Sequence, residues 1–160
     1  MKRKHSTSHS YHTVFVDTNV FYNVLFETEY ADVSQQLLET IPNPATSHTV
    51  VNEPVFTVVR KAVERRYGVR SYYEFRRVIG EKGYTIVEDY IDKTLGLLED
   101  SEVKIVDDYY DLDEWLKIMK NYRLLPNDAQ TTLTCKHYGI NTIATFDKDS
   151  RRAPWLKVIP

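Results

Sequence analysis

Four carboxylates in this chain lie next to apolar runs that should be buried. They are Asp17, Glu53, Asp128 and Asp147, and Asp149 lies two residues past the last of them. Acidic side chains at strand ends and helix starts are what an α/β protein uses to hold a hard divalent cation in a crevice. The residue types and their positions therefore point to a metal site built from oxygen ligands.

The chemistry of such a site follows from charge. Carboxylates packed together repel one another, and fully ionised they persist only with cations among them. Oxygen-only ligation suits Mg²⁺ or Mn²⁺, which keep several waters and accept phosphate oxygens. A bound ion can polarise a phosphoryl oxygen and help to form hydroxide from water, and two ions about 4 Å apart could stabilise the attacking and leaving oxygens. No His, Cys or Ser nucleophile is then needed.

Each acid taken alone has a plainer structural explanation. Asp17 fits a turn at a strand end, and Asp147 with Asp149 fits a loop. Asp128 fits the first turn of a helix, where the positive helix N-terminus favours an acid. Glu53 lies among apolar residues, where an unpartnered buried glutamate is costly, so it belongs at a solvent-facing edge or beside a cation. The joint pattern favours one shared site, because a single fold would bring these acids together.

The elements that must position these acids alternate along the chain. The predicted strands cover residues 13–17, 45–47, 103–106, 142–146 and 156–159. The predicted helices cover residues 19–26, 32–39, 47–67, 71–79, 84–99, 111–121 and 127–138. Strands interleaved with helices indicate a parallel sheet covered on both faces. The crevice of such a sheet lies beyond the carboxyl ends of its strands, where Asp17 and Asp147 fall.

Local signals set several boundaries. Ser47 or Thr49 is expected to cap the long third helix, and Gly68 to end it. The residues 84–87 also have the composition of a strand, although residues 84–99 as a whole have helical spacing. The helix at 111–121 is expected to turn Leu112 inward, together with the apolar residues that follow it at helical spacing.

Length and composition bound the class of protein. The 160 residues suit one domain with a real core, so we expect a flexible polar arm at residues 1–12 and a single folded domain at 13–160. Cys135 is the only cysteine, which excludes an intramolecular disulfide and a cysteine zinc site within one chain. That usage fits a reducing cytoplasm, and no apolar run approaches the length of a membrane span. We expect a cytoplasmic protein without a membrane segment.

The net charge of −2 hides a strong polarity. Residues 60–77 carry seven basic side chains against two acidic ones, and residues 81–114 carry twelve acidic against three basic. Such runs are ordinarily solvated helix faces. The basic strip would instead attract phosphate if the carboxylate site acts on nucleic acid.

Two blocks of the sequence resemble the PIN domain family. Residues 14–19, Val-Phe-Val-Asp-Thr-Asn, are similar to the opening of a PIN domain, and residues 125–130 with 138–149 are similar to its distal half. The resemblance covers residues 13–160 and rests on order, spacing and flanking apolar runs together. It implies a three-layer αβα sandwich with a central parallel sheet, and metal-dependent ribonuclease activity.

The resemblance also implies roles for individual residues. Four residues match the four acids of the family: Asp17, Glu53, Asp128 and Asp147. Asp17, Asp128 and Asp147 would hold Mg²⁺ or Mn²⁺, with Glu53 and Asp149, which matches a frequent fifth acid, binding a second ion or orienting the water. Asn19 or Thr18 matches the small polar residue that orders the first acid, and Thr145 matches a polar residue near the fourth. The candidates for holding the RNA backbone are basic residues near the acids: Arg60, Lys61, Lys148, Arg151 and Arg152.

Within the family the chain most resembles small stand-alone proteins such as VapC-type toxins, which cleave RNA and usually form dimers. That implies an RNA substrate, an antitoxin partner and a homodimer, for which residues 21–38 are the expected interface. Residues 70–103 are long for a minimal VapC, so a housekeeping RNA-processing nuclease is an alternative. A non-catalytic scaffold that binds RNA or protein is another, although the presence of all four acids argues against it.

Overall fold

A computed structural model describes residues 12–160, so the polar arm expected at 1–12 lies, apart from His12, outside the described residues. The described chain contains one five-stranded parallel sheet with the strand order β3–β2–β1–β4–β5. Its strands are short: β1 (Val14–Val16), β2 (Pro44–Ser47), β3 (Lys104–Val106), β4 (Thr142–Ala144) and β5 (Lys157–Ile159). All five lie within the predicted strand regions or overlap them by all but one residue.

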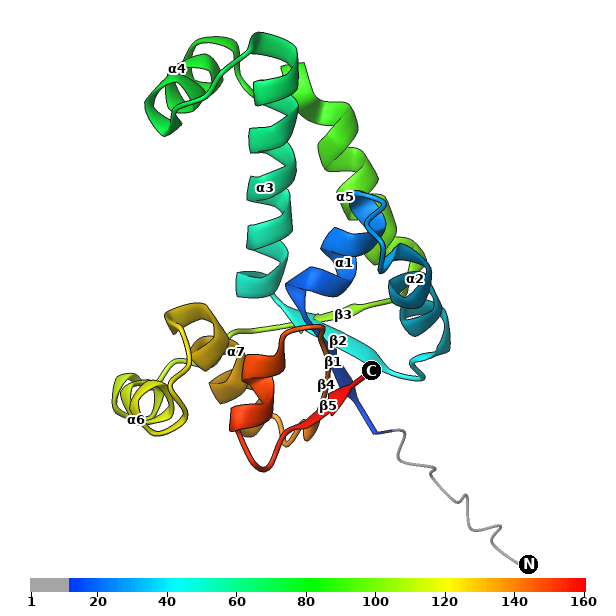
Figure 1. Cartoon of the computed structure of the whole chain (residues 1–160), viewed down its shortest axis with the longest axis vertical. Coiled ribbons are helices and arrows are strands. Elements are labelled where there is room, and N and C mark those ends of the chain that lie inside the picture. The colour runs from blue at the N-terminus through cyan, green and yellow to red at the C-terminus, as the bar shows by residue number, and fades with distance from the viewer. Residues whose placement is uncertain (1–11) are drawn as a thin grey trace, which may run out of the picture.

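The helices cover both faces of this sheet (Figure 1). In chain order they are α1 (Thr18–Leu25), α2 (Ala31–Thr40), α3 (His48–Tyr67), α4 (Tyr72–Lys82), α5 (Glu88–Asp100), α6 (Leu112–Tyr122) and α7 (Pro126–His137), with the short 3-10 helices η1 (Tyr84–Val87) and η2 (Lys148–Arg152). From β1 the chain adds β2 and then β3 on one side of β1, and it then returns to add β4 and β5 on the other side. Right-handed crossovers then place α1 to α5 on one face and α6 with α7 on the opposite face. The predicted three-layer αβα sandwich is confirmed.

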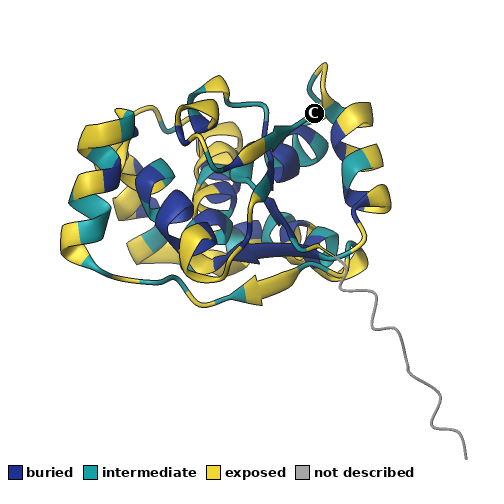
Figure 2. Ribbon diagram, turned by 90° about the horizontal axis from the view of Figure 1, so that it is seen from below, coloured by how far each residue is buried: buried dark blue, intermediate teal, exposed yellow. Residues whose placement is uncertain are grey.

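The core is centred on β1, whose three residues are all buried. Phe15 pairs with Ala45 on one side and with Ile143 on the other, so the central strand has a buried neighbour at each edge. A continuous apolar run is what a strand covered on both faces requires. Figure 2 shows the buried residues gathered on the inner strands and on the helix faces that point towards them.

A second, smaller core holds the far half of α3. Its buried members come from α3, α4 and η1: Val59, Ala62, Val63, Phe75, Val78 and Val87. Figure 1 shows α4 at the end of α3 that lies away from the sheet. Helix α3 ends as predicted at Gly68, whose φ of 66° is readily adopted by glycine. The long α3–α5 unit is therefore a packed extension of the domain.

Two local predictions were wrong. Residues Tyr84–Val87 form the 3-10 helix η1, neither a strand nor the first turn of α5. Leu112 is 68% exposed, while Ile118 is the buried residue of α6. Leu112, the first residue of α6, borders an open hollow that Gln130 of α7 also lines. Helix α6 packs instead through the stripe formed by Trp115, Ile118, Met119 and Tyr122.

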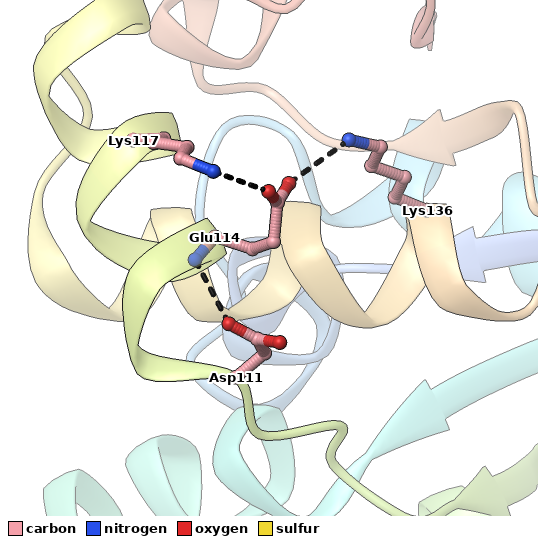
Figure 3. Close-up of polar contacts among 4 residues, drawn as sticks. All are labelled: Asp111, Glu114, Lys117 and Lys136. Atoms are coloured by element: carbon pink, nitrogen blue, oxygen red, sulfur yellow. Dashed lines mark hydrogen bonds and ion pairs between the residues drawn. The ribbon is translucent and has the colours of Figure 1, made fainter.

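Polar contacts hold α6 against α7, which carries Asp128 (Figure 3). Asp111 caps α6 by accepting a hydrogen bond from the Glu114 backbone N–H at 3.0 Å. The Glu114 carboxylate accepts from Lys117 at 2.9 Å and from Lys136 of α7 at 3.3 Å, which lowers its pKa. Exposed ion pairs of this kind add little stability, so their main effect here is to fix the contact between the two helices.

None of the helices in residues 12–160 is both long enough and apolar enough to cross a membrane.

Candidate functional site

The candidate site lies where the strand order changes direction, beside β1 and β4. Asp17 directly follows β1, and its backbone N–H donates to the Ala144 carbonyl oxygen at the end of β4 at 3.0 Å. Asp147 follows β4 after two intervening residues. In an open parallel sheet the crevice outside the strands' carboxyl ends, at such a reversal, is where ligands bind. The first and fourth predicted acids therefore share this edge.

A hydrogen-bond network holds the first acid. Asp17 Oδ2 accepts from Asn19 Nδ2 at 3.0 Å and from Thr145 Oγ1 at 2.7 Å. Asn19 Oδ1 accepts in turn from the Phe146 backbone N–H at 3.0 Å. Burial raises the pKa of Asp17, hydrogen bonds from the Thr145 side chain and the Thr18 backbone oppose that rise, and the charges of Glu53 and Asp147 add to it. Asn19 thus contacts the first acid, as expected, and Thr145, which was expected near the fourth acid, also contacts the first.

Glu53 occupies the second turn of α3 and is exposed. Its Oε2 atom accepts a hydrogen bond from Thr18 Oγ1 at 3.2 Å, so the Thr18 side chain contacts the second acid, while the Thr18 backbone hydrogen-bonds to the first. The solvent-facing alternative for Glu53 is the one that the structure supports. Because Thr18 is the residue next to Asp17, this contact also ties the start of α1 to α3.

Asp128 is the acid on which the charges of the other four candidate acids act. It is half-buried in the first turn of α7. Burial raises its pKa, and so do the charges of four other acids, to about 6: Asp17, Asp147, Glu53 and Asp149. Like charges disfavour the ionised form when they lie near one another. The four other acids therefore lie close enough to Asp128 to act on it through their charges.

The fourth and fifth acids are held by their own loop. Asp147 Oδ1 accepts from the Asp149 backbone N–H at 2.8 Å, and Asp149 Oδ1 pairs with Arg152 at 2.7 Å. Arg152 also donates to the Arg123 carbonyl oxygen at 2.7 Å, which leaves little of its guanidinium free for RNA. Arg60, Lys148 and Arg151, three of the other predicted backbone contacts, are exposed.

The donor set suits a hard divalent cation, although its present geometry is open. In residues 12–160, no three His, Cys, Asp or Glu side chains gather tightly enough to hold an ion between them. Asp17, Glu53, Asp147 and Asp149 each accept a hydrogen bond from a nearby side chain or backbone N–H, as expected for like charges that repel one another. The ion pairs of the described residues leave Asp17, Glu53, Asp128 and Asp147 without a cationic side chain. A cation would therefore relieve uncompensated charge here, and Mg²⁺ needs only one or two carboxylates beside its waters.

One candidate residue near the site was missed. Asp108 lies two residues after β3, and its Oδ2 atom accepts from the Thr49 backbone N–H at 2.9 Å, so it caps the helix that carries Glu53. Ser47, the expected cap, makes no such bond, and its hydroxyl has no partner. Asp108 was predicted only as part of a run of acids. Its position just after a strand, as for Asp17, was the signal that could have singled it out.

Comparison with known proteins places this geometry in a family. A family model described as PIN domain matches residues 14–156. A protein of Methanocaldococcus jannaschii named Ribonuclease VapC6 is 29% identical over 153 residues, which is 91% of this chain and 95% of that protein. The crystal structure of Mycobacterium tuberculosis VapC20, described as a Sarcin-Ricin loop cleaving toxin, matches with a TM-score of 0.59 and 16% identity over 92% of this chain and 99% of that one.

A further match is the crystal structure of VapBC2 from Rickettsia felis bound to a DNA fragment from their promoter. It has a TM-score of 0.53 and 13% identity over 92% of this chain and 97% of that one. At these identities the two structures bear on the fold. The family model covers four of the five strands, all but β5, and every candidate acid. This chain belongs to the PIN domain family.

Proposed function

We propose that this protein is a metal-dependent ribonuclease of the VapC toxin type. The observation that carries the proposal is the meeting of acids from separate elements around Asp128, whose pKa their charges and its burial raise to about 6. The similarity to a protein named Ribonuclease VapC6 supports an RNA substrate. Asp17, Glu53, Asp128 and Asp147 pair with no cationic side chain of residues 12–160, which supports a role for Mg²⁺ or Mn²⁺.

In this proposal Asp17, Asp128 and Asp147 hold the cation, and Glu53 and Asp149 bind a second ion or orient the attacking water. A bound ion would polarise the phosphoryl oxygen and lower the pKa of a coordinated water. The protein's own side chains set the geometry. Asn19 and Thr145 keep Asp17 in one orientation through hydrogen bonds to its carboxylate. The carboxylate therefore needs no reorientation when the site is filled.

Glu53 has the freedom that water positioning requires. It is exposed, its only described hydrogen bond comes from Thr18, and it lies on the first turns of a long, well-packed helix. Water attacking the phosphodiester in line would leave a 5′-phosphate and a 3′-hydroxyl. This polarity is part of the proposal and can be read from the end groups of the products.

The test is cleavage of a panel of single-stranded and structured RNAs with millimolar Mn²⁺ or Mg²⁺, and with EDTA. We expect cleavage that requires the metal, is abolished in Asp128→Asn, and persists in Asp92→Asn, which removes an exposed acid of α5 outside the site. Cleavage that survives EDTA or Asp128→Asn would contradict the assignment. Retained RNA binding with no cleavage would favour the scaffold alternative.

We further propose that a partner protein restrains the nuclease, as an antitoxin. The fold similarity to VapBC2 of Rickettsia felis supports this part of the proposal. Expression of this chain alone in a bacterial host should arrest growth, and expression of Asp128→Asn should not. RNA cleavage in vitro without growth arrest would instead favour the housekeeping alternative.

A homodimer remains a prediction. Phe21 and Leu38, the ends of its expected interface, are buried in this chain's own core. An interface on this region would therefore use the exposed Tyr30 and Val33.

A further inference from the structure

A cavity of about 500 Å³ lies between α1, α3 and α5. Its volume is within the range of small-molecule sites, roughly 300–1,000 Å³. Its lining includes three cationic and three aromatic side chains: Lys61, Arg65, Lys93, Tyr22, Phe26 and Tyr90. The candidate acids do not line it, so this cavity is a separate feature of the domain.

The charge of the cavity wall favours an anion. Among the described residues, Lys61, Arg65 and Lys93 make no ion pair with a carboxylate. Glu27 is the one acid in the lining, so the wall carries two excess positive charges. Unpaired cations around a concave surface raise the local concentration of anions.

The aromatic side chains hold one of these cations in place. Lys61 Nζ donates to Tyr22 Oη at 2.7 Å and lies 4.2 Å from the centre of the Phe26 ring. A cation at this distance from a ring face is attracted by the ring's negative face. Aromatic surface beside fixed positive charge is the combination with which proteins bind the bases and the phosphates of single-stranded nucleic acid.

The cavity and the candidate site lie along the same pair of helices, α1 and α3. Thr18 of α1 contacts Glu53 of α3, and one turn further along α1, Tyr22 contacts Lys61 of α3. Lys61 lies eight residues after Glu53, which is about 12 Å along the helix axis at 1.5 Å per residue. A few nucleotides of a single strand would cover that span.

We propose that this cavity binds a nucleotide of the RNA substrate a few positions from the cleaved bond, with its phosphate at Lys61, Arg65 and Lys93 and its base against the aromatic wall. This inference rests on the proposed ribonuclease function and adds a subsite to it. The subsite would contribute to RNA affinity without taking part in the chemical step.

The experiment measures binding of a fluorescently labelled single-stranded RNA to the full chain carrying Asp128→Asn, which prevents cleavage in the proposed mechanism. Lys61→Met keeps the apolar stem of the side chain and removes its charge. The matched control is Lys82→Met, because Lys82 also lies over a tyrosine ring, that of Tyr67, but outside the cavity. Each change removes one exposed positive charge and its attraction to aromatic rings, from two rings for Lys61 and from one for Lys82.

We expect Lys61→Met to weaken RNA binding about tenfold and to reduce the salt dependence by about one phosphate contact, with Lys82→Met within twofold of the parent. Phe26→Leu should weaken binding several-fold, because a ring is lost while every charge remains. If Lys61→Met and Lys82→Met weakened RNA binding equally, the effect would come from net charge alone, and the inference would be overturned. A Lys61 dependence seen with 5′-AMP or an acidic peptide and not with RNA would also overturn it.

Cleavage by the unmodified chain separates this inference from the proposed function. Cleavage with RNA binding unaffected by Lys61→Met leaves the nuclease and removes the subsite. Lys61-dependent RNA binding without cleavage under any metal condition leaves the subsite and removes the nuclease.

Discussion

The hydroxyl of Thr145 donates to Asp17 Oδ2 at 2.7 Å, a contact between residues 128 positions apart in the sequence. Thr145 Oγ1 also accepts hydrogen bonds, from Asn19 Nδ2 at 2.9 Å and from the Asp147 backbone N–H at 3.0 Å. Thr145 is 2% exposed, so water cannot easily replace it. One buried hydroxyl thus links the first acid of the site to the backbone of the fourth.

Replacing this hydroxyl should damage both stability and activity. Thr145→Val has nearly the same shape but leaves Asp17 Oδ2, the Asn19 amide and the Asp147 N–H each without one partner. We expect a loss of about 1–3 kcal/mol in the free energy of unfolding, measured by urea denaturation. RNA cleavage should fall further than the folded fraction does, because Asp17 loses a fixed orientation.

Thr145→Ser is the matched control, since it restores the hydroxyl and removes only a methyl group. It should recover most of the cleavage, with a stability loss of about 1 kcal/mol from the deleted methyl. Equal cleavage by the valine and serine variants would show that the hydroxyl does not position Asp17.

The raised pKa of Asp128 predicts a pH-dependent stability. In the folded protein this pKa is about 6, above its ordinary value of 3.8, so the native state binds the proton more tightly than the unfolded state. The stabilising contribution is complete below about pH 4 and is lost as the pH rises through about 6. Asp128→Asn cannot undergo this loss.

In EDTA, Asp128→Asn should therefore unfold at a higher temperature than the parent at pH 8, and at nearly the same temperature at pH 4. The gain is about 1 kcal/mol after discounting for the solvent that screens a half-buried group, or about 2–4 °C for a chain of this size. Thermal unfolding followed by circular dichroism measures it. A variant less stable than the parent at pH 8 would mean that Asp128 has a structural role.

How far the sequence predicted this site depends on the range of the interactions involved. Asp17 and Asp147 were predictable neighbours, because both follow strands of a parallel sheet and the edge they share is set by topology. Asn19 and Thr145 were predictable only through the family resemblance. Asn19 or Thr18 was expected beside the first acid; the Asn19 side chain contacts it, and the Thr18 hydroxyl contacts Glu53.

Other features could not be predicted because they depend on how distant helices meet. The contact of Lys61 with Tyr22 joins α3 to α1 across 39 positions, and nothing in either local sequence requires it. Leu112 is exposed because it borders an open hollow between α6 and α7, which the spacing of apolar residues does not reveal. Periodicity identifies a buried face, but the neighbouring element decides which part of that face is covered.

Divalent cations should stabilise the protein through the proposed site. A ligand that binds only the folded state at about 100 times its dissociation constant adds about 2.7 kcal/mol. Mn²⁺ should therefore raise the unfolding temperature of the parent and of Asp92→Asn, but not that of Asp17→Asn. Equal shifts in all three proteins would indicate that Mn²⁺ binds elsewhere. Because unfolding is measured without RNA, the result does not depend on finding the substrate.

Asp108 should support Glu53 from a distance by capping α3 through the Thr49 N–H. Asp108→Asn keeps an oxygen acceptor but removes the charge that favours a helix N-terminus, so it should cost a few tenths of a kcal/mol. Asp108→Ala removes the cap and should cost about 1–2 kcal/mol in urea unfolding. The neighbouring Asp107→Ala is the matched control, because Asp107 is exposed and makes no described hydrogen bond.

If the cap also fixes the start of α3 under Glu53, cleavage by Asp108→Ala should fall mainly in kcat, while Asp108→Asn and Asp107→Ala stay near the parent. A loss of stability with unchanged kcat would limit Asp108 to a structural role. A fall in kcat for Asp107→Ala as large as for Asp108→Ala would instead assign the effect to the negative charge of this loop. The cap would then not be the cause, because Asp107 accepts no described hydrogen bond from α3.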